Sequence, residues 1–243
     1  MIDIKSDPKN MRRIAGRLAI IVSNDAHLIL YLKNSLNEEG FRVVDVPEYR
    51  CIPKMIKNSP HNVIILDMSI SLMRGFKLYR LLHQKFGSPV LALVSHKHKE
   101  QIKALDAGAD ACMQKPVDRM ELLAHIHALL RRTQTQPADL PVEEQGYMVN
   151  DLYIDPLYHQ VKLGDIEINL TLTEFYLLLL LARKLGHVVS RRELLEQIWG
   201  YGRLESDRTL YVHMCRLRKK IEPDPDHPER LLVVRGLGYK LKG

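Results

Sequence analysis

The sequence predicts an α/β protein of two domains, a doubly wound five-stranded parallel sheet followed by a smaller α+β domain. Five short apolar runs alternate with helical segments over residues 17–132, and a stretch with prolines and acids follows at 133–146. Residues 147–243 then combine short strand-like segments, helices and a final glycine-containing hairpin. With 243 residues the chain is long enough for two cores of ordinary size.

Composition indicates a globular protein with a polyanionic partner. The chain is 46% hydrophobic and 27% charged, and its net charge is +7. Its three cysteines lie far apart without a CxxC pair, which argues against a zinc site or a disulfide framework and fits a reducing compartment. Residues 1–16 read as a polar, basic tail without the apolar core of a signal peptide, and no apolar run reaches the ~20 residues of a membrane span. We therefore expect a cytoplasmic protein with no membrane contact.

Short apolar runs predict the strands of the first domain. They lie at residues 18–23, 41–46, 62–67, 89–94 and 111–114. Helical segments are predicted between and after them, at residues 27–39, 50–58, 76–86, 98–107 and 118–131. Because five mainly apolar strands alternate with helices, the sheet should be parallel and covered on both faces. The functional groups of such sheets lie at the carboxyl ends of the strands, where we expect Asp67 and Lys115.

The second domain begins with strand-like segments that predict a small antiparallel sheet over residues 147–170. Two helices follow. Thr171 with Glu174, and Ser190 with Glu193, match the capping-box pattern at their starts, and each helix is followed by a glycine. The apolar character of the first helix on all sides predicts that it is buried.

Residues 206–221 predict an amphipathic helix with one apolar and one basic face. The apolar stripe comprises Leu210, Met214, Leu217 and Ile221. The opposite face comprises Arg208, Val212, Cys215, Arg216 and Lys219. A helix fits the major groove of B-DNA, where arginine can bind both N7 and O6 of guanine. Taken alone, the pattern is more typical of an ordinary helix with a solvated basic face, and the segments around it favour the DNA-binding interpretation.

Residues 231–243 predict a hairpin with Gly236 and Gly238 at its turn. The order helix, turn, helix and hairpin is that of a winged helix-turn-helix. In this arrangement residues 206–221 enter the major groove, and the hairpin brings Arg235 to a phosphate or to the minor groove.

The first domain resembles the receiver domain of two-component response regulators. The resemblance rests on IILD in the third strand, GAD at 108–110 and the Lys115-Pro116 pair. It implies phosphorylation of Asp67, with Mg²⁺ held by two acids after the first strand. Those two positions are Ser23 and Asn24 here, and Asp25 comes one place later.

Other receiver positions also depart from the pattern. The switch threonine corresponds to Val94, the switch aromatic to Cys112, and the proline after the phosphorylated aspartate to Ser71. We therefore expect a degenerate receiver with no cofactor and no cognate kinase, in which Asp67 is a buried carboxylate paired with Lys115.

The resemblance also implies a homodimer formed through the fourth helix, fifth strand and fifth helix. An acid of the usual salt bridges is replaced by Ala111 and an arginine by His125. We expect the dimer face to depend on apolar contacts of Met120, Leu122 and Leu123. Losing exposed ion pairs costs only about 0–1 kcal/mol each, so a dimer remains expected.

Residues 147–243 resemble the effector domain of OmpR/PhoB-type response regulators. The motifs are LTLTEFYLLLLLA, VVSRRELLEQIWG, RTLYVHMCRLRKKI and VRGLGYKL. The resemblance implies a base contact by Arg216. The full DNA-binding set it implies is Arg208, Thr209, Tyr211, His213, Arg216, Arg218, Lys219, Arg235, Gly236 and Tyr239. Tyr211 and Cys215 stand where relatives have other polar residues, which predicts a different target sequence. Loop 200–206, with Tyr201, Arg203 and Glu205, corresponds to the segment that contacts RNA polymerase.

These features predict a sequence-specific transcription regulator without enzymatic activity. Its expected partners are double-stranded promoter DNA, RNA polymerase and a second copy of the chain. Two alternatives stay open. One is a conventional switch phosphorylated on Asp67, which would need Asn24 and Asp25 to hold Mg²⁺. The other is a receiver that binds a protein or a small ligand in the vacant pocket.

Overall fold

A computed structural model describes residues 17–46, 63–69, 88–95, 98–134, 146–200 and 206–243. The chain divides into two compact units, residues 1–126 and 127–243. The division falls within α6 (Arg119–Gln134). The expected tail, the linker, the helices at 50–58 and 76–86, and the loop with Tyr201, Arg203 and Glu205 lie outside the described residues. Within the described part of the chain, no helix is both long and apolar enough to cross a membrane.

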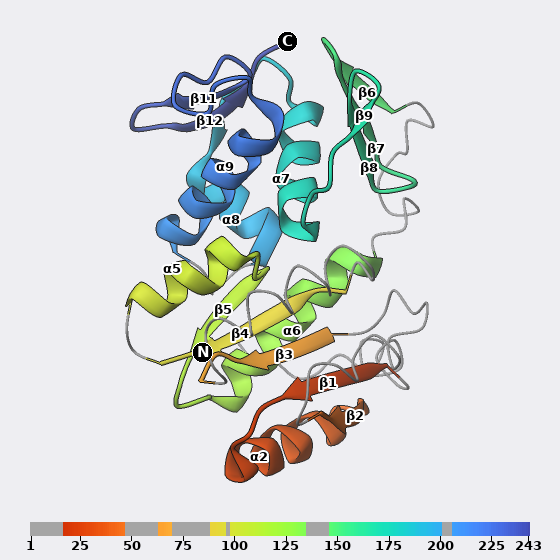
Figure 1. The fold of residues 1–243 in the computed structure, drawn as a ribbon, viewed down its shortest axis with the longest axis vertical. Helices are drawn as coiled ribbons and strands as arrows, with labels where there is room; N and C mark the ends of the chain where they lie inside the picture. The colour runs from red at the N-terminus through yellow and green to blue at the C-terminus, as the bar shows by residue number, and fades with distance from the viewer. Residues whose placement is uncertain (1–16, 47–62, 70–87, 96–97, 135–145, 201–205) are drawn as a thin grey trace, which may run out of the picture. The chain divides into compact units, whose positions relative to one another are not determined.

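The first unit contains the predicted five-stranded parallel sheet (Figure 1). Its strands are β1 (Leu18–Val22), β2 (Arg42–Asp45), β3 (Val63–Asp67), β4 (Val90–Val94) and β5 (Ala111–Gln114). Their spatial order is β2-β1-β3-β4-β5, and every neighbouring pair is parallel. All five residues of β3 and of β4 are buried, as their apolar sequences predict.

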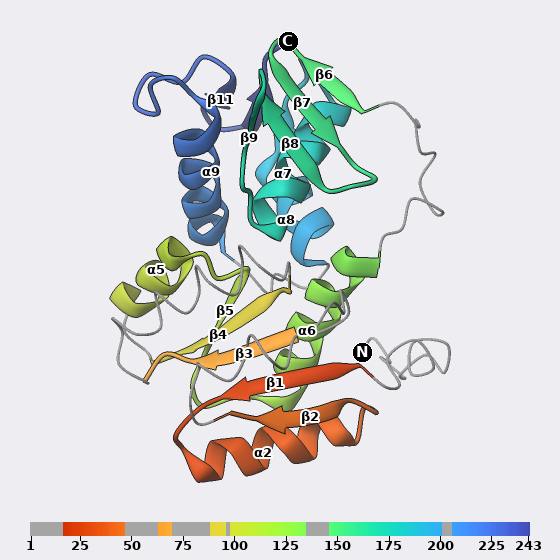
Figure 2. The ribbon, with the colours of Figure 1, turned by 45° about the vertical axis from the view of Figure 1, so that its right-hand side comes forward.

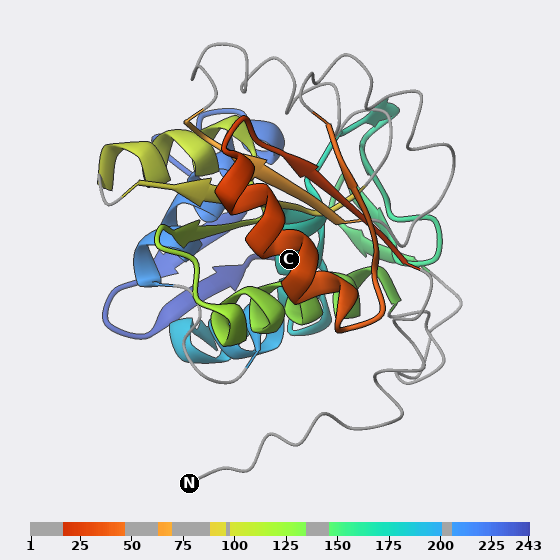
Figure 3. The ribbon, with the colours of Figure 1, turned by 90° about the horizontal axis from the view of Figure 1, so that it is seen from below.

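Helices cover this sheet. In the described residues these are α2 (Ala26–Asn37), α5 (His98–Ala107) and α6. Arg119, at the start of α6, pairs with Glu38 and Glu39 just after α2, so the two helices lie side by side, as Figure 3 shows. Helix α5 packs against β4 and β5. Asp67 is the last residue of β3, so it lies at the carboxyl end of the central strand of the sheet.

The second unit begins with a four-stranded antiparallel sheet. It consists of β6 (Tyr147–Val149), β7 (Leu152–Asp155), β8 (Gln160–Leu163) and β9 (Ile166–Glu167), in that order. The sheet packs on α7 (Leu172–Arg183), as Figure 2 shows. Burial of Leu177, Leu178 and Leu181 in α7 confirms the prediction of a core helix.

Two more helices and a hairpin complete the winged helix-turn-helix. They are α8 (Arg191–Trp199), α9 (Asp207–Ile221), β11 (Leu231–Val234) and β12 (Gly238–Leu241). A short strand that the sequence analysis did not predict, β10 (Val189–Ser190), pairs with β12 and makes a three-stranded sheet. The four residues of the predicted apolar stripe of α9 are all fully buried.

Side-chain caps begin α7 and α8. Thr171 Oγ1 accepts from the Glu174 amide at 3.1 Å, and Glu174 Oε2 accepts from the Thr171 amide at 2.8 Å, which confirms the predicted capping box. Ser190 caps α8 through the Glu193 amide at 3.1 Å. The second capping box is incomplete, because the Glu193 carboxylate pairs with Lys184 instead.

Candidate nucleic-acid interface and phospho-acceptor pocket

The exposed face of α9 is a narrow stripe along the helix. Arg208, Tyr211 and Lys219 are exposed, and Cys215 and Arg218 are half-buried. These residues are three or four positions apart, so their side chains lie on one face. Ser206 begins the helix by accepting from the Thr209 amide at 3.4 Å. The stripe therefore has cationic groups at both ends and uncharged groups between them.

The hairpin β11–β12 lies against α9 and carries the exposed Arg235 at its turn. Arg218 Nε donates to the Leu231 carbonyl oxygen at 2.9 Å, which joins α9 to β11. Gly236 has φ +76°, a left-handed conformation that a glycine adopts without strain. The turn can thus hold Arg235 at a fixed place relative to α9.

Three residues of the predicted DNA-binding set are buried instead. Thr209 and His213 have 0% exposure, and Tyr239 has 3%. The His213 ring lies against Trp199 of α8, with ring centroids 5.6 Å apart. In this conformation these three side chains are not exposed to a DNA partner, and the contacts expected of them stay a prediction. The helical wheel put His213 on a flank, but α8 covers that flank.

Arg216 is turned toward the core rather than outward. Its side chain is 15% exposed, and its Nε lies 3.3 Å from Glu174 Oε1. Lys220 Nζ lies 2.5 Å from Glu174 Oε2 and also donates to the Asn169 carbonyl oxygen at 2.7 Å. In this conformation the guanidinium of Arg216 is thus paired inside the unit, and the base contact expected of it stays a prediction.

Glu174 is the functional residue that the sequence analysis missed. Its side chain is fully buried on α7, and its carboxylate connects α7 to two cations of α9. Burial opposes ionisation of Glu174, but the charges of Arg216 and Lys220 outweigh this effect and lower its pKa. The capping box identified Glu174 without revealing this second role. The ion triad fixes α9, and hence its exposed stripe, against the core.

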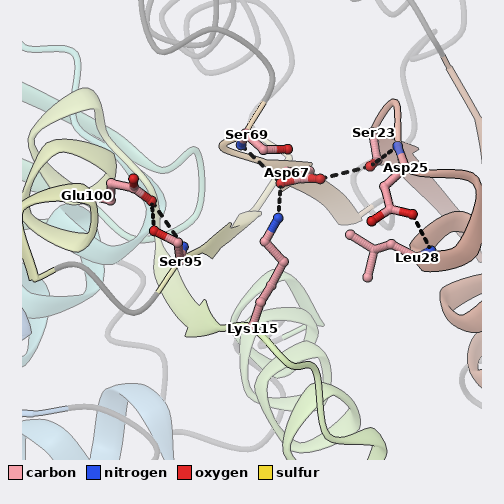
Figure 4. A network of polar contacts seen from close by, with 8 residues as sticks. All are labelled: Ser23, Asp25, Leu28, Asp67, Ser69, Ser95, Glu100 and Lys115. Atoms are coloured by element: carbon pink, nitrogen blue, oxygen red, sulfur yellow. Dashed lines mark hydrogen bonds and ion pairs between the residues drawn. The ribbon is translucent and has the colours of Figure 1, made fainter.

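Asp67, at the end of β3, is 1% exposed and its two oxygens are both engaged (Figure 4). Lys115 Nζ donates to Oδ1 at 2.7 Å, and so does the Ser69 amide at 3.0 Å. The Ser23 hydroxyl donates to Oδ2 at 2.9 Å. Burial raises the pKa of Asp67, but these donors outweigh it and hold the pKa below its ordinary value. The expected pairing of Asp67 with Lys115 is present.

The residues after β1 do not fit the Mg²⁺ that receiver domains use. Ser23 supplies a hydroxyl, which donates to Asp67, in place of a carboxylate. Asp25 caps α2, where its Oδ1 accepts from the amides of His27 at 3.0 Å and Leu28 at 3.1 Å. Asn24 is exposed. Since the hard cation prefers several oxygen ligands that include carboxylates, no step through a bound metal follows from this arrangement.

The resemblance to receiver domains places Val94 and Cys112 at the two positions expected to respond to a phosphoryl group. Val94 is fully buried, and its side chain has no hydrogen-bond donor. The next residue, Ser95, directs its amide and hydroxyl to Glu100 Oε2, at 3.1 and 2.5 Å. Cys112 is 5% exposed on β5, where it acts as a small core residue.

The expected dimer face is mostly internal. Ala111 and Leu122 are fully buried, and His125 and Leu123 are 1% and 7% exposed. Only Met120 of the five predicted residues exposes its side chain substantially, at 59%. The side chains of Leu122 and Leu123 pack inward in this conformation, and the dimer contacts expected of them stay a prediction.

Comparisons with known proteins agree with this two-part organisation. Residues 19–127 match the family model of the response regulator receiver domain. Residues 165–241 match that of the C-terminal part of transcriptional regulatory proteins. The DNA-binding response regulator MtrA of Mycobacterium tuberculosis (strain ATCC 25618 / H37Rv) is 34% identical over 222 residues, covering 91% of this chain and 95% of MtrA.

Two further relatives extend the comparison. MtrA of Mycobacterium leprae is also 34% identical over 222 residues, with 91% and 96% of the two chains covered. Among solved structures, a single-substitution mutant of RitR has a TM-score of 0.76 at 25% identity, over 94% of this chain and 100% of that one.

Proposed function

This chain belongs to the OmpR/PhoB-type response regulators, which join a receiver domain to a winged-helix DNA-binding domain, and we propose that it regulates transcription without phosphorylation of Asp67. It is a DNA-binding response regulator of the two-component type. Two features of the structure, seen together, support the proposal that the chain acts without phosphorylation of Asp67. The exposed cationic stripe of α9 is anchored by a buried ion triad, and the Asp67 carboxylate is fully engaged without a metal.

The stripe of α9 supplies the contacts with promoter DNA. Arg208 at the start of the helix and Lys219 near its end reach the phosphates on the two sides of the major groove. Arg235 at the hairpin turn reaches the backbone or the adjacent minor groove. Arg216 acts indirectly, because its pairing with Glu174 fixes the orientation of α9.

Independence from phosphorylation rests on the partners of Asp67. A phosphoryl group on Oδ1 or Oδ2 would displace Ser23, Ser69 or Lys115. Among the described residues after β1, no second carboxylate is available to bind Mg²⁺, since Asp25 is used as a helix cap. Lys115 neutralises part of the charge of Asp67, but without a divalent cation the incoming phosphate keeps its own negative charge and is repelled by the carboxylate.

The further partners we propose are a second copy of the chain and RNA polymerase. Two copies on tandem half-sites about one helical turn apart would suit the geometry of helix-turn-helix proteins. Met120, exposed at the start of α6, is the apolar residue of the predicted dimer set that remains available.

The proposal is tested by the salt dependence of binding to duplex DNA selected by the full chain from a random pool. Loss of one contact between a lysine and a phosphate reduces the magnitude of the slope of log K against log salt by about 1. Lys219→Ala should show this reduction. Lys162→Ala serves as the matched control, because Lys162 is exposed on β8 of the separate four-stranded sheet and should leave the slope unchanged.

The same assay tests the receiver. Asp67→Asn should bind the selected duplex as tightly as the unmodified chain, and addition of Mg²⁺ with beryllofluoride should leave the affinity of both unchanged. A saturable rise in affinity that Asp67→Asn abolishes would instead establish a phosphorylation switch. Equal slopes for Lys219→Ala and Lys162→Ala would remove α9 from the interface.

A further inference from the structure

We propose that Tyr211 and Cys215 form the base-reading centre of α9 and select thymine through its 5-methyl group. This inference rests on the proposed function, because it assumes that the exposed stripe of α9 faces the major groove. It goes further by assigning the chemistry of the bases that the helix reads.

Exposure along α9 singles out these two residues. Tyr211 is 57% exposed and Cys215 is half-buried. Between Arg208 and Arg218, the other side chains are either buried or, in the case of Arg216, engaged with Glu174. The buried set comprises Thr209, Leu210, Val212, His213, Met214 and Leu217. The middle of the helix therefore presents an aromatic ring and a thiol, with no outward-facing cation.

The side chains of Tyr211 and Cys215 lie next to each other on the exposed face of α9. They are four residues apart on the helix, hence neighbours on the same face. Hydrogen bonding with Cys215 raises the pKa of the Tyr211 hydroxyl, which accords with contact between the two groups. The result is a weakly polar patch on an otherwise cationic stripe.

The chemistry of this patch matches one feature of the major groove. Guanine is read best by a bidentate arginine or lysine, and adenine by asparagine or glutamine. The thymine methyl is the apolar group on the major-groove edge of the base pairs, and it is read by apolar contact. An aromatic ring beside a thiol offers such contact. Arg208 and Lys219 hold the two ends of the stripe at phosphates, so the patch meets the base edges between them.

The test replaces single thymidines of the selected half-site by deoxyuridine, which removes only the methyl group. The unmodified full chain should lose affinity by about fourfold at one or two central positions, the value of burying one methyl group. Tyr211→Ala and Cys215→Ala should bind the thymidine and deoxyuridine duplexes more nearly alike. Tyr211→Phe, which keeps the ring, and Lys219→Ala should retain the discrimination even if overall affinity falls.

Two results would overturn the inference in distinguishable ways. If the chain selects a defined sequence but the unmodified protein tolerates deoxyuridine at every position, the thymine-reading role is wrong and the proposed function stands. If no sequence is enriched from the random pool, the proposed function fails and this inference fails with it. The deoxyuridine comparison uses the unmodified protein, so it does not depend on the folding of any variant.

Discussion

At the scale of single residues, Glu174 explains how the recognition helix is held. Glu174 of α7 pairs with Arg216 and Lys220 of α9. The Glu174 side chain is fully buried, whereas the side chains of Arg216 and Lys220 are 15% and 30% exposed. Removing one member of a buried charge cluster leaves the others unpaired, which costs more than the pair itself contributes. The triad is therefore more important for the placement of α9 than for net stability.

Glu174→Gln should lower the free energy of unfolding of the second unit by about 3 kcal/mol, because it leaves two partly buried cations without their partner. Urea denaturation followed by the fluorescence of Trp199, the single tryptophan and buried beside α9, measures this unit selectively. Glu196→Gln is the control, since it removes only an exposed pair with Arg192. Similar midpoints for the two variants would contradict this role of Glu174.

Acid should reduce the difference in the free energy of unfolding between Glu174→Gln and the unmodified chain. The pKa of Glu174 lies below its ordinary value of 4.5, so its contribution to stability is complete above pH 4.5. The contribution is lost as the pH falls through the lower pKa of the folded state, because the carboxyl then becomes protonated in both states. Trp199 fluorescence across this range provides the measurement.

The sequence pattern predicted which residues of the apolar stripe of α9 are buried, but it did not predict the partners of His213 and Arg216. The apolar stripe of α9 followed from helical spacing alone, because every member points the same way. The burial of His213 depends on Trp199 of another helix, and the engagement of Arg216 depends on Glu174 of a third. Helical periodicity describes one helix at a time and carries no information on such partners. In the receiver unit, the pairing of Asp67 with Lys115 was predictable because both follow strands that end at the same edge.

At the scale of elements, strands and helices were predicted well where long apolar runs or caps mark them. The strands of the first unit start and end within a residue of their expected positions, because each has an apolar run bounded by polar or turn residues. Strand β10 was missed, since two residues have no periodicity to detect. Its partner offered a signal: Gly238 lies where β12 passes closest to β10, and any larger side chain would collide with it.

Gly238→Ala should therefore disrupt the sheet that supports the hairpin. A Cβ atom at this position would lie 1.9 Å from the Val189 carbonyl oxygen, so β10 and β12 must separate. We expect a loss of about 3 kcal/mol or more, seen by Trp199 fluorescence, together with faster hydrogen exchange at the Tyr239 amide. Gly236→Ala is the control: it has open space around it, and its left-handed φ of +76° costs about 1 kcal/mol. Equal stability of the two variants would show that the close approach to Val189 has no structural role.

At the scale of the whole molecule, the chain consists of a receiver domain followed by a winged-helix DNA-binding domain. In the receiver unit Asp67 pairs with Lys115, and Ser23 and Val94 stand where the resemblance to receiver domains implies a metal-binding acid and the switch threonine. The DNA-binding unit has the winged-helix architecture of its family, and the middle of α9 exposes Tyr211 and Cys215. Family resemblance predicted the two-domain organisation and marked Tyr211 and Cys215 as unusual, whereas only their exposure indicated that they are the side chains available in the middle of α9.

The central claim is that the exposed stripe of α9 gives sequence-specific binding to DNA, and the most direct test is the ratio of affinities for the selected duplex and a scrambled duplex of equal composition. At physiological salt the full chain should prefer the selected duplex on the order of 10³-fold or more. Arg208→Ala combined with Tyr211→Ala should reduce that ratio greatly. A ratio near one for the unmodified chain, or a ratio that the double substitution leaves unchanged, would contradict the claim.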